Sequence, residues 1–147
     1  DEDFIEKRTS RLFEGPPRKV EDQVAWIVQL AKLMNGTLYP IDVDAETALA
    51  VAEVETGWAA ETGHGVAAFS SKSRLDRLVE IAAPTLIVHG SADVVLPIEH
   101  GQALAEGIPG AVYIEVDGLG HEVPDGLIAE MWPVLQHHLR SSTDWAG

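Results

Sequence analysis

Residues 84–90 read Pro-Thr-Leu-Ile-Val-His-Gly, an apolar run rich in β-branched side chains that lies between a proline and a glycine. Such a run is typical of a strand that is buried on both faces of a parallel sheet. A second candidate strand covers Ala111–Val116, where Val112, Ile114 and Val116 alternate with more polar neighbours. This looser alternation indicates a strand nearer the edge of the sheet.

A helix is expected between these strands. Pro97 suits the first position of a helix, and Gly107 marks its end after about Glu106. A strand-helix-strand unit makes its two strands parallel through a right-handed crossover. We therefore assign the chain to the α/β class, with parallel strands and flanking helices. Two parallel strands do not form a stable sheet alone, so the sequence predicts an incomplete sheet whose other strands lie upstream of Asp1 or on another polypeptide.

The remainder of the chain is predicted to be helical. Helices are expected at Phe4–Phe13, Val20–Met34, Ala45–Ala59, Ser73–Ile81 and Pro124–Ser141. Asp44 is the expected N-cap of the third of these helices, whose apolar face would use Ala48, Leu49, Val51 and Ala52. Pro133 is expected to kink or split the last helix, since a proline inside a helix removes a backbone hydrogen bond.

Composition excludes several classes of partner. The 147 residues carry a formal net charge of −14, which disfavours binding to nucleic acid or to an anionic membrane. Cysteine is absent, so disulfides, cysteine-zinc sites and thiol nucleophiles are excluded. The longest apolar run is Ile81–Val88, too short to cross a membrane and interrupted by Pro84. No secretory leader is visible, and we expect a cytoplasmic protein.

Metal and cofactor patterns are also weak. The acids of Asp42–Glu46 alternate as in a calcium loop, but the turn glycine and the bidentate glutamate of such a loop are missing. The segment that begins His121-Glu122 lacks the second histidine of a zinc-protease motif. We expect no metal and no cofactor.

One loop follows each predicted strand. Asp93 lies in the first loop and His121 in the second. Functional sites of open α/β sheets gather at the carboxyl ends of the strands, and neighbouring strands lie about 5 Å apart. We therefore expect the carboxylate and the imidazole to meet. Two plainer interpretations stay open: Asp93 could cap the helix that begins near Pro97, and His121 could be an ordinary loop histidine. His89 is expected at the edge of the core.

These loops carry the patterns Gly-x-x-Asp-x-x-x-Pro, from Gly90 to Pro97, and Gly-x-Gly-His, from Gly118 to His121. The pair resembles the C-terminal half of the α/β-hydrolase family, most closely the esterase branch that includes aclacinomycin methylesterase. In that family an acid follows the seventh strand and a histidine follows the eighth. The resemblance implies that Asp93 is the acid of a catalytic triad and that His121 is its general base. It also implies that residues 1–73 form a helical cap and residues 74–147 the C-terminal part of the core.

The nucleophile of that family is missing. It lies in a Gly-x-Ser-x-Gly motif, and this motif does not occur in the chain. The resemblance therefore implies a carboxylic ester hydrolase with a Ser-His-Asp triad, whose serine and oxyanion hole come from an N-terminal half in the same gene or in a second chain. This chain alone should be inactive. An aspartate nucleophile would instead give a dehalogenase or epoxide hydrolase, and a hydrolase-like module that binds without turnover is a further alternative.

The expected substrate is a small-molecule ester. Apolar side chains of the helical half could form the walls of its pocket, or could equally pack the helices against one another. The candidates are Trp26, Met34, Tyr39 and Trp58.

Overall fold

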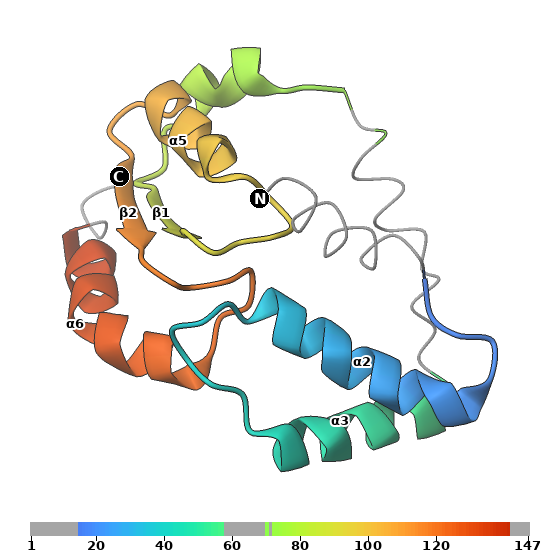
Figure 1. Ribbon diagram of the computed structural model, residues 1–147. Helices are drawn as coiled ribbons and strands as arrows, with labels where there is room; N and C mark the ends of the chain where they lie inside the picture. Colours follow the sequence, from blue (N-terminus) through green and yellow to red (C-terminus); the bar gives the residue numbers. More distant parts are fainter. Residues whose placement is uncertain (1–14, 58–69, 71, 142–147) are drawn as a thin grey trace.

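The structure, a computed structural model, describes residues 15–57, 70 and 72–141. Its elements in chain order are α2 (Val20–Met34), α3 (Val43–Glu55), the 3-10 helix η1 (Leu75–Glu80), β1 (Leu86–Gly90), α5 (Ile98–Gly107), β2 (Val112–Val116) and α6 (Asp125–Ser141) (Figure 1). The expected helix at Phe4–Phe13 lies outside the described residues, as does the end of the predicted Ala45–Ala59 segment.

The two predicted strands form a parallel pair. Leu86 lies opposite Val112 and Gly90 opposite Val116, and α5 makes the crossover between the strands. No other described segment joins this sheet, so the predicted α/β class and its incomplete sheet are confirmed. Full burial of β1 was the wrong expectation for Leu86, Ile87 and Val88, which are only half-buried because no described segment pairs with the second edge of β1.

The strands lie between α5 and α6 (Figure 1). The core of the described residues is thin, and its buried apolar side chains are Val28, Ala50, Ile108, Leu119 and Leu127. On α6, Trp132 remains 51% exposed and Leu139 remains 61% exposed. Large apolar side chains left open beside a two-stranded sheet are what a partial α/β fold predicts, since no further strand joins this sheet in the described part of the chain.

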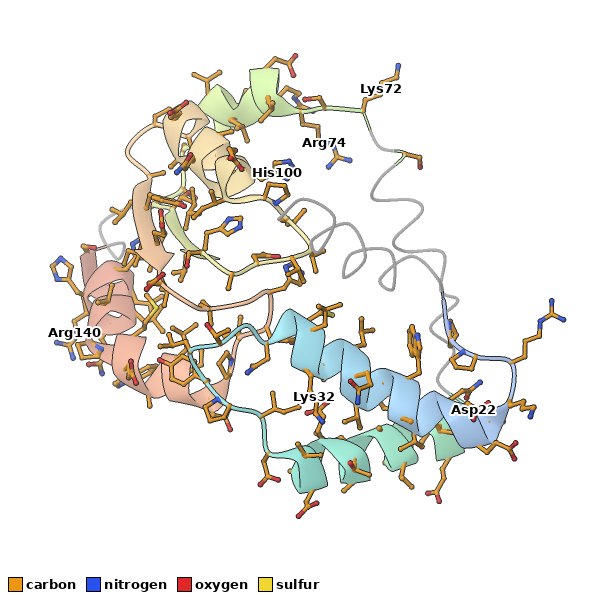
Figure 2. All side chains as sticks on the ribbon, in the orientation of Figure 1. Asp22, Lys32, Lys72, Arg74, His100 and Arg140 are labelled. Atoms are coloured by element: carbon orange, nitrogen blue, oxygen red, sulfur yellow. The ribbon has the colours of Figure 1, made fainter. Side chains whose placement is uncertain are left out.

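Helices α2 and α3 pack side by side, apart from the sheet (Figure 1). Helix α2 has the predicted bounds. Its ends carry charges that favour the helix dipole, because Asp22 lies in the first turn and Lys32 in the last (Figure 2).

Helix α3 departs from its prediction in two ways. Its N-cap is Asp42 and not Asp44: the Oδ1 atom of Asp42 accepts hydrogen bonds from the backbone N–H groups of Asp44 and Ala45, both at 3.0 Å. The expected apolar face is also wrong. Its four members, Ala48, Leu49, Val51 and Ala52, are exposed, whereas Ala50 is fully buried.

Two other helices differ from expectation. The short helix near Ser73–Ile81 is a 3-10 helix over Leu75–Glu80. Helix α6 is one element that runs through Pro133, so of the two expected effects, a kink or a split, the split does not occur. Pro133 cannot donate to the carbonyl of Ala129, one turn earlier, but both residues are exposed and water can satisfy that carbonyl. None of the described helices is long and apolar enough to cross a membrane.

Candidate active site

The two predicted site residues meet. His121 Nδ1 lies 2.9 Å from Asp93 Oδ2, and the pair joins the loop after β1 to the loop after β2. Both loops leave the carboxyl ends of parallel strands, which is where functional groups of α/β sheets gather. The Asp93 side chain is 7% exposed and the His121 side chain 34% exposed, so the carboxylate is enclosed while the imidazole reaches the surface of the site.

Local backbone amides hold the Asp93 carboxylate. Its Oδ1 atom accepts from the N–H groups of Val95 at 2.7 Å and Leu96 at 2.9 Å, which leaves Oδ2 for His121. Burial raises the pKa of the Asp93 carboxyl, but the hydrogen bonds from Leu96, His121 and Val95 outweigh burial and hold that pKa below its ordinary value. Asp93 therefore stays ionised, and its capping role and its contact with His121 coexist.

A serine ties the two loops together. The Ser91 hydroxyl donates to Asp117 Oδ1 at 2.9 Å and accepts from the Gly118 N–H at 2.9 Å. The backbone adds a further link, since the Ala92 N–H donates to the Leu119 carbonyl at 2.9 Å. The loop that bears the acid and the loop that bears the histidine thus form one unit, which fixes the distance between their side chains.

The end of α2 holds the histidine loop from the other side. The Met34 carbonyl accepts from the His121 N–H at 2.6 Å and from the Glu122 N–H at 3.3 Å. In return, the Gly118 carbonyl accepts from the Thr37 N–H at 2.7 Å. Backbone groups of the helical half thus fix the position of His121 relative to the two strands. Sequence reasoning missed this contact, because backbone hydrogen bonds leave no signal in residue type.

The hydrogen bond to Asp93 fixes which ring nitrogen of His121 carries the proton. A carboxylate oxygen only accepts, so Nδ1 is the donor and Nε2 of the neutral ring presents its lone pair. Nε2 has no hydrogen-bond partner among the residues that the structure describes. The pair can therefore take up a proton at Nε2 and stabilise the resulting imidazolium, which is general-base chemistry.

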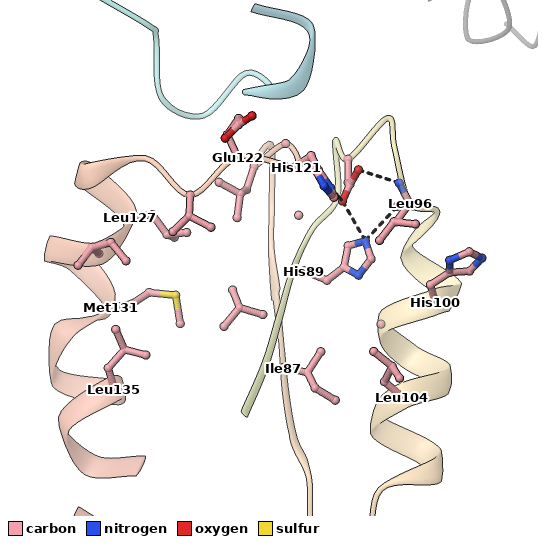
Figure 3. Close-up of a pocket in the computed structure, with 18 residues that line it drawn as sticks. Ile87, His89, Leu96, His100, Leu104, His121, Glu122, Leu127, Met131 and Leu135 are labelled. Atoms are coloured by element: carbon pink, nitrogen blue, oxygen red, sulfur yellow. Dashed lines mark hydrogen bonds and ion pairs between the residues drawn. The ribbon is translucent and has the colours of Figure 1, made fainter. Parts of the chain in front are cut away.

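An apolar cavity of about 420 Å³ begins at this pair. Figure 3 shows Leu127, Met131 and Leu135 of α6 on one side of the strands. Ile87 of β1 lies on the other side, toward Leu104 of α5. A volume of several hundred Å³ with mainly apolar walls and a few polar groups suits a small organic ligand. Within the described residues, no cluster of acidic or histidine side chains could hold a metal ion.

The predicted substrate residues lie elsewhere. Trp26 is half-buried on α2, and Met34 contributes its carbonyl to the histidine loop. Tyr39 lies against α6: burial and a hydrogen bond with Glu130 raise the pKa of its hydroxyl. None of these three residues belongs to the described wall of the cavity. Trp58 lies outside the described residues, so the role of all four in substrate binding stays a prediction.

The sequence predicted that His89 lies at the edge of the core, and its exposure of 8% confirms this. The structure further places His89 in the site. Its Nε2 atom also lies 3.5 Å from Asp93 Oδ2. The spacing of His89 and Asp93, one residue on a strand and one in the following loop, gave no indication that the loop folds back over the strand end.

No protein-family model matches the chain. Among curated proteins, it is 25% identical over 143 residues to a rhodomycin D methylesterase of Streptomyces peucetius, covering 95% of this chain and 47% of the relative. A second rhodomycin D methylesterase, of Streptomyces sp. (strain C5), is 27% identical over 135 residues, covering 90% of this chain and 45% of the relative. The α/β hydrolase domain-containing protein 17C of Xenopus tropicalis is 37% identical over 54 residues, 36% of this chain and 17% of that protein.

Two solved structures share the fold. A bromoperoxidase from Bacillus anthracis superposes with a TM-score of 0.56 at 23% identity, covering 92% of this chain and 48% of the other. An N-acyl homoserine lactone degrading enzyme superposes with a TM-score of 0.52 at 24% identity, covering 89% of this chain and 53% of the other. The chain has part of an α/β-hydrolase fold and resembles the esterase-like members of that family, as predicted. It spans about half the length of the curated relatives that it matches.

Proposed function

We propose that the protein carrying this chain is a carboxylic ester hydrolase, in which Asp93 and His121 are the acid and the general base of a Ser-His-Asp triad. The hydrogen bond of 2.9 Å between His121 Nδ1 and Asp93 Oδ2 is the observation that supports this most directly. The methylesterase relatives support an ester substrate, and the mainly apolar cavity supports one of medium size.

The proposed steps follow from the geometry. His121 Nε2 removes the proton of a serine hydroxyl as the serine oxygen attacks the ester carbonyl, and the imidazolium that forms is stabilised by the ionised Asp93. The imidazolium then protonates the departing alcohol, which leaves an acyl-enzyme. Water attacks this intermediate in the same way, with His121 again accepting a proton and returning it to the serine. Asp93 keeps the ring in the required tautomer throughout.

The serine belongs to a segment that this chain does not contain. We place that segment along the second edge of β1, because the apolar surface continues there. The cavity at the site follows Ile87 and Val88, and a second cavity of about 480 Å³ follows the strand from Pro84 to Val88 beside Trp132 and Leu139. A further parallel strand would fill this groove and would bring its own carboxyl end, where a nucleophile lies, to the rim that holds His121.

The test uses the complete protein, meaning this chain with whatever segment or partner polypeptide completes it. We expect hydrolysis of para-nitrophenyl butyrate and covalent labelling by a serine-directed phosphonate. His121→Gln and Asp93→Asn should each lower kcat by about a thousandfold or more, since loss of a triad member costs on the order of 10⁴. Glu46→Gln, on the distant α3, is the matched control and should leave kcat unchanged.

Each unfavourable result has a definite meaning. An active protein that resists the phosphonate, but forms an ester on an aspartate, would be a dehalogenase or epoxide hydrolase and would overturn the serine mechanism. Binding of the ester without turnover would make the protein a binding module. Hydrolysis at an enzymatic rate by these 147 residues alone would contradict the missing nucleophile.

A further inference from the structure

We propose that His89 is a positioning residue that aims the Asp93 carboxylate at His121, an inference that rests on the proposed function. His89 lies near the end of β1 and is 8% exposed. Its Nε2 atom lies 3.0 Å from the Leu96 carbonyl oxygen and 3.5 Å from Asp93 Oδ2 (Figure 3). The Asp93 Oδ2 atom thus lies between the rings of His89 and His121. His121 is the proposed general base, and His89 holds the carboxylate in place.

The contact with Leu96 determines the state of the His89 ring. A carbonyl oxygen can only accept a hydrogen bond, so Nε2 must carry a proton. Gly101 of α5 touches the opposite side: a Cβ atom at that position would overlap Nδ1. The ring is therefore held between a hydrogen bond and a helix backbone.

Leu96 transmits this restraint to the acid. Its N–H donates to Asp93 Oδ1 at 2.9 Å, while its carbonyl accepts from His89. Leu96 is thus held by two hydrogen bonds, one from its N–H to Asp93 and one from His89 to its carbonyl. With Oδ1 occupied by this loop, Oδ2 is the oxygen that remains for His121, at 2.9 Å. Without His89, the Leu96 carbonyl loses its donor and the carboxylate is free to turn away from His121.

Histidine NMR on the complete protein tests this without requiring turnover. In the wild type, ¹⁵N-resolved spectra should show a proton on His89 Nε2 and a slowly exchanging proton on His121 Nδ1. His89→Phe should abolish that His121 signal, whereas His89→Gln, whose amide can donate from nearly the same place, should restore it. Gly101→Ala should also weaken it, by pushing the His89 ring aside. His137→Phe, at an exposed position of α6, is the matched control and should leave it unchanged.

Kinetics gives the second readout. With para-nitrophenyl butyrate, His89→Phe should lower kcat about 10- to 100-fold at unchanged KM, and His89→Gln should recover most of it. A His89 ring without a proton on Nε2 in the wild type would overturn the proposal, as would a full His121 signal in a folded His89→Phe protein. If the complete protein proves to be no hydrolase, the proposed function fails, while the NMR result still decides whether His89 orients Asp93. If His89→Phe does not fold, Gly101→Ala and the proton on His89 Nε2 of the wild type decide it.

Discussion

At the scale of single residues, the pKa of the Asp93 carboxyl determines how the site responds to pH. Its folded pKa is depressed because the hydrogen bonds from Leu96, His121 and Val95 outweigh its burial. A depressed carboxyl pKa contributes stability above the pKa of the unfolded chain, about 3.9, and that contribution is lost as the pH falls through the folded pKa. Acid should therefore loosen the site only once the pH falls below the ordinary range of an aspartate, where Asp93 becomes protonated.

Asp93→Asn tests this dependence. The variant should lose about 1–3 kcal/mol of stability near pH ~7, because an amide N–H would face the His121 Nδ1–H and charge-assisted hydrogen bonds are lost. The loss should shrink as the pH falls through the folded pKa of Asp93, because the wild-type carboxyl is then itself protonated. Urea unfolding at several pH values measures both effects. Asp76→Asn, at an exposed position of η1, should show neither, and an equal loss at all these pH values would refute the role of ionisation.

The sequence predicted the Asp93–His121 pair, because both residues follow predicted strands whose carboxyl ends must share one edge of the sheet. It could not predict the partners supplied by backbone atoms. The Met34 carbonyl that holds the His121 N–H belongs to a residue expected, if anything, to touch substrate with its side chain. The same holds for His89, whose hydrogen bond is to a carbonyl oxygen of Leu96 and not to a side chain.

At the scale of elements, the strongly patterned helices were predicted better than their ends. Helix α2 has one apolar stripe and formed as expected. Helix α3 is rich in alanine and valine on every side, so hydropathy did not choose its buried face, and Ala50 is the residue that is buried. Asp42 and Asp44 were equally plausible caps by residue type, and only the backbone conformation of Asp42 decided between them.

The junction between α2 and the histidine loop depends on close backbone contact. At Gly120, an added Cβ would overlap the Met34 carbonyl oxygen and would strike backbone atoms of Asn35 and Gly36. Backbone cannot rotate away as a side chain can, so Gly120→Ala should cost about 1–3 kcal/mol or more. The exchange of the His121 amide proton, now bonded to Met34, should become much faster. Unfolding and hydrogen exchange measure the two effects.

Gly110→Ala is the matched control for that junction. Gly110 has a φ of 73° with nothing within 4 Å of an added Cβ, so its replacement adds backbone strain of about 1–2 kcal/mol and no collision. It should leave the exchange of the His121 amide unchanged relative to global stability. Equal exchange in the two variants would mean that the α2 junction does not hold the histidine loop.

At the scale of the whole molecule, the described residues leave one edge of β1 without a partner strand. Among the described residues β1 pairs with β2 on one edge only, and the apolar side chains that line the groove along β1 include Trp132 and Leu139. An exposed apolar strand edge favours association with another strand. Under the proposed function, one completing segment would supply both the further strands of the sheet and the nucleophile.

Two leucines of nearly equal exposure separate this explanation from a general tolerance of surface charge. Leu139 on α6 is 61% exposed and lines the groove along β1, whereas Leu49 on α3 is 60% exposed and lies away from it. If the completing segment covers the groove, Leu139 is buried in the complete protein, and Leu139→Lys should cost about 2–3 kcal/mol through lost apolar burial and a desolvated charge. Leu49→Lys should change stability by less than about 0.5 kcal/mol. Thermal unfolding of the complete protein measures both changes, and light scattering gives its mass. Equal effects of the two lysines would show that no segment covers the groove. The proposed route by which a serine reaches His121 would then be wrong.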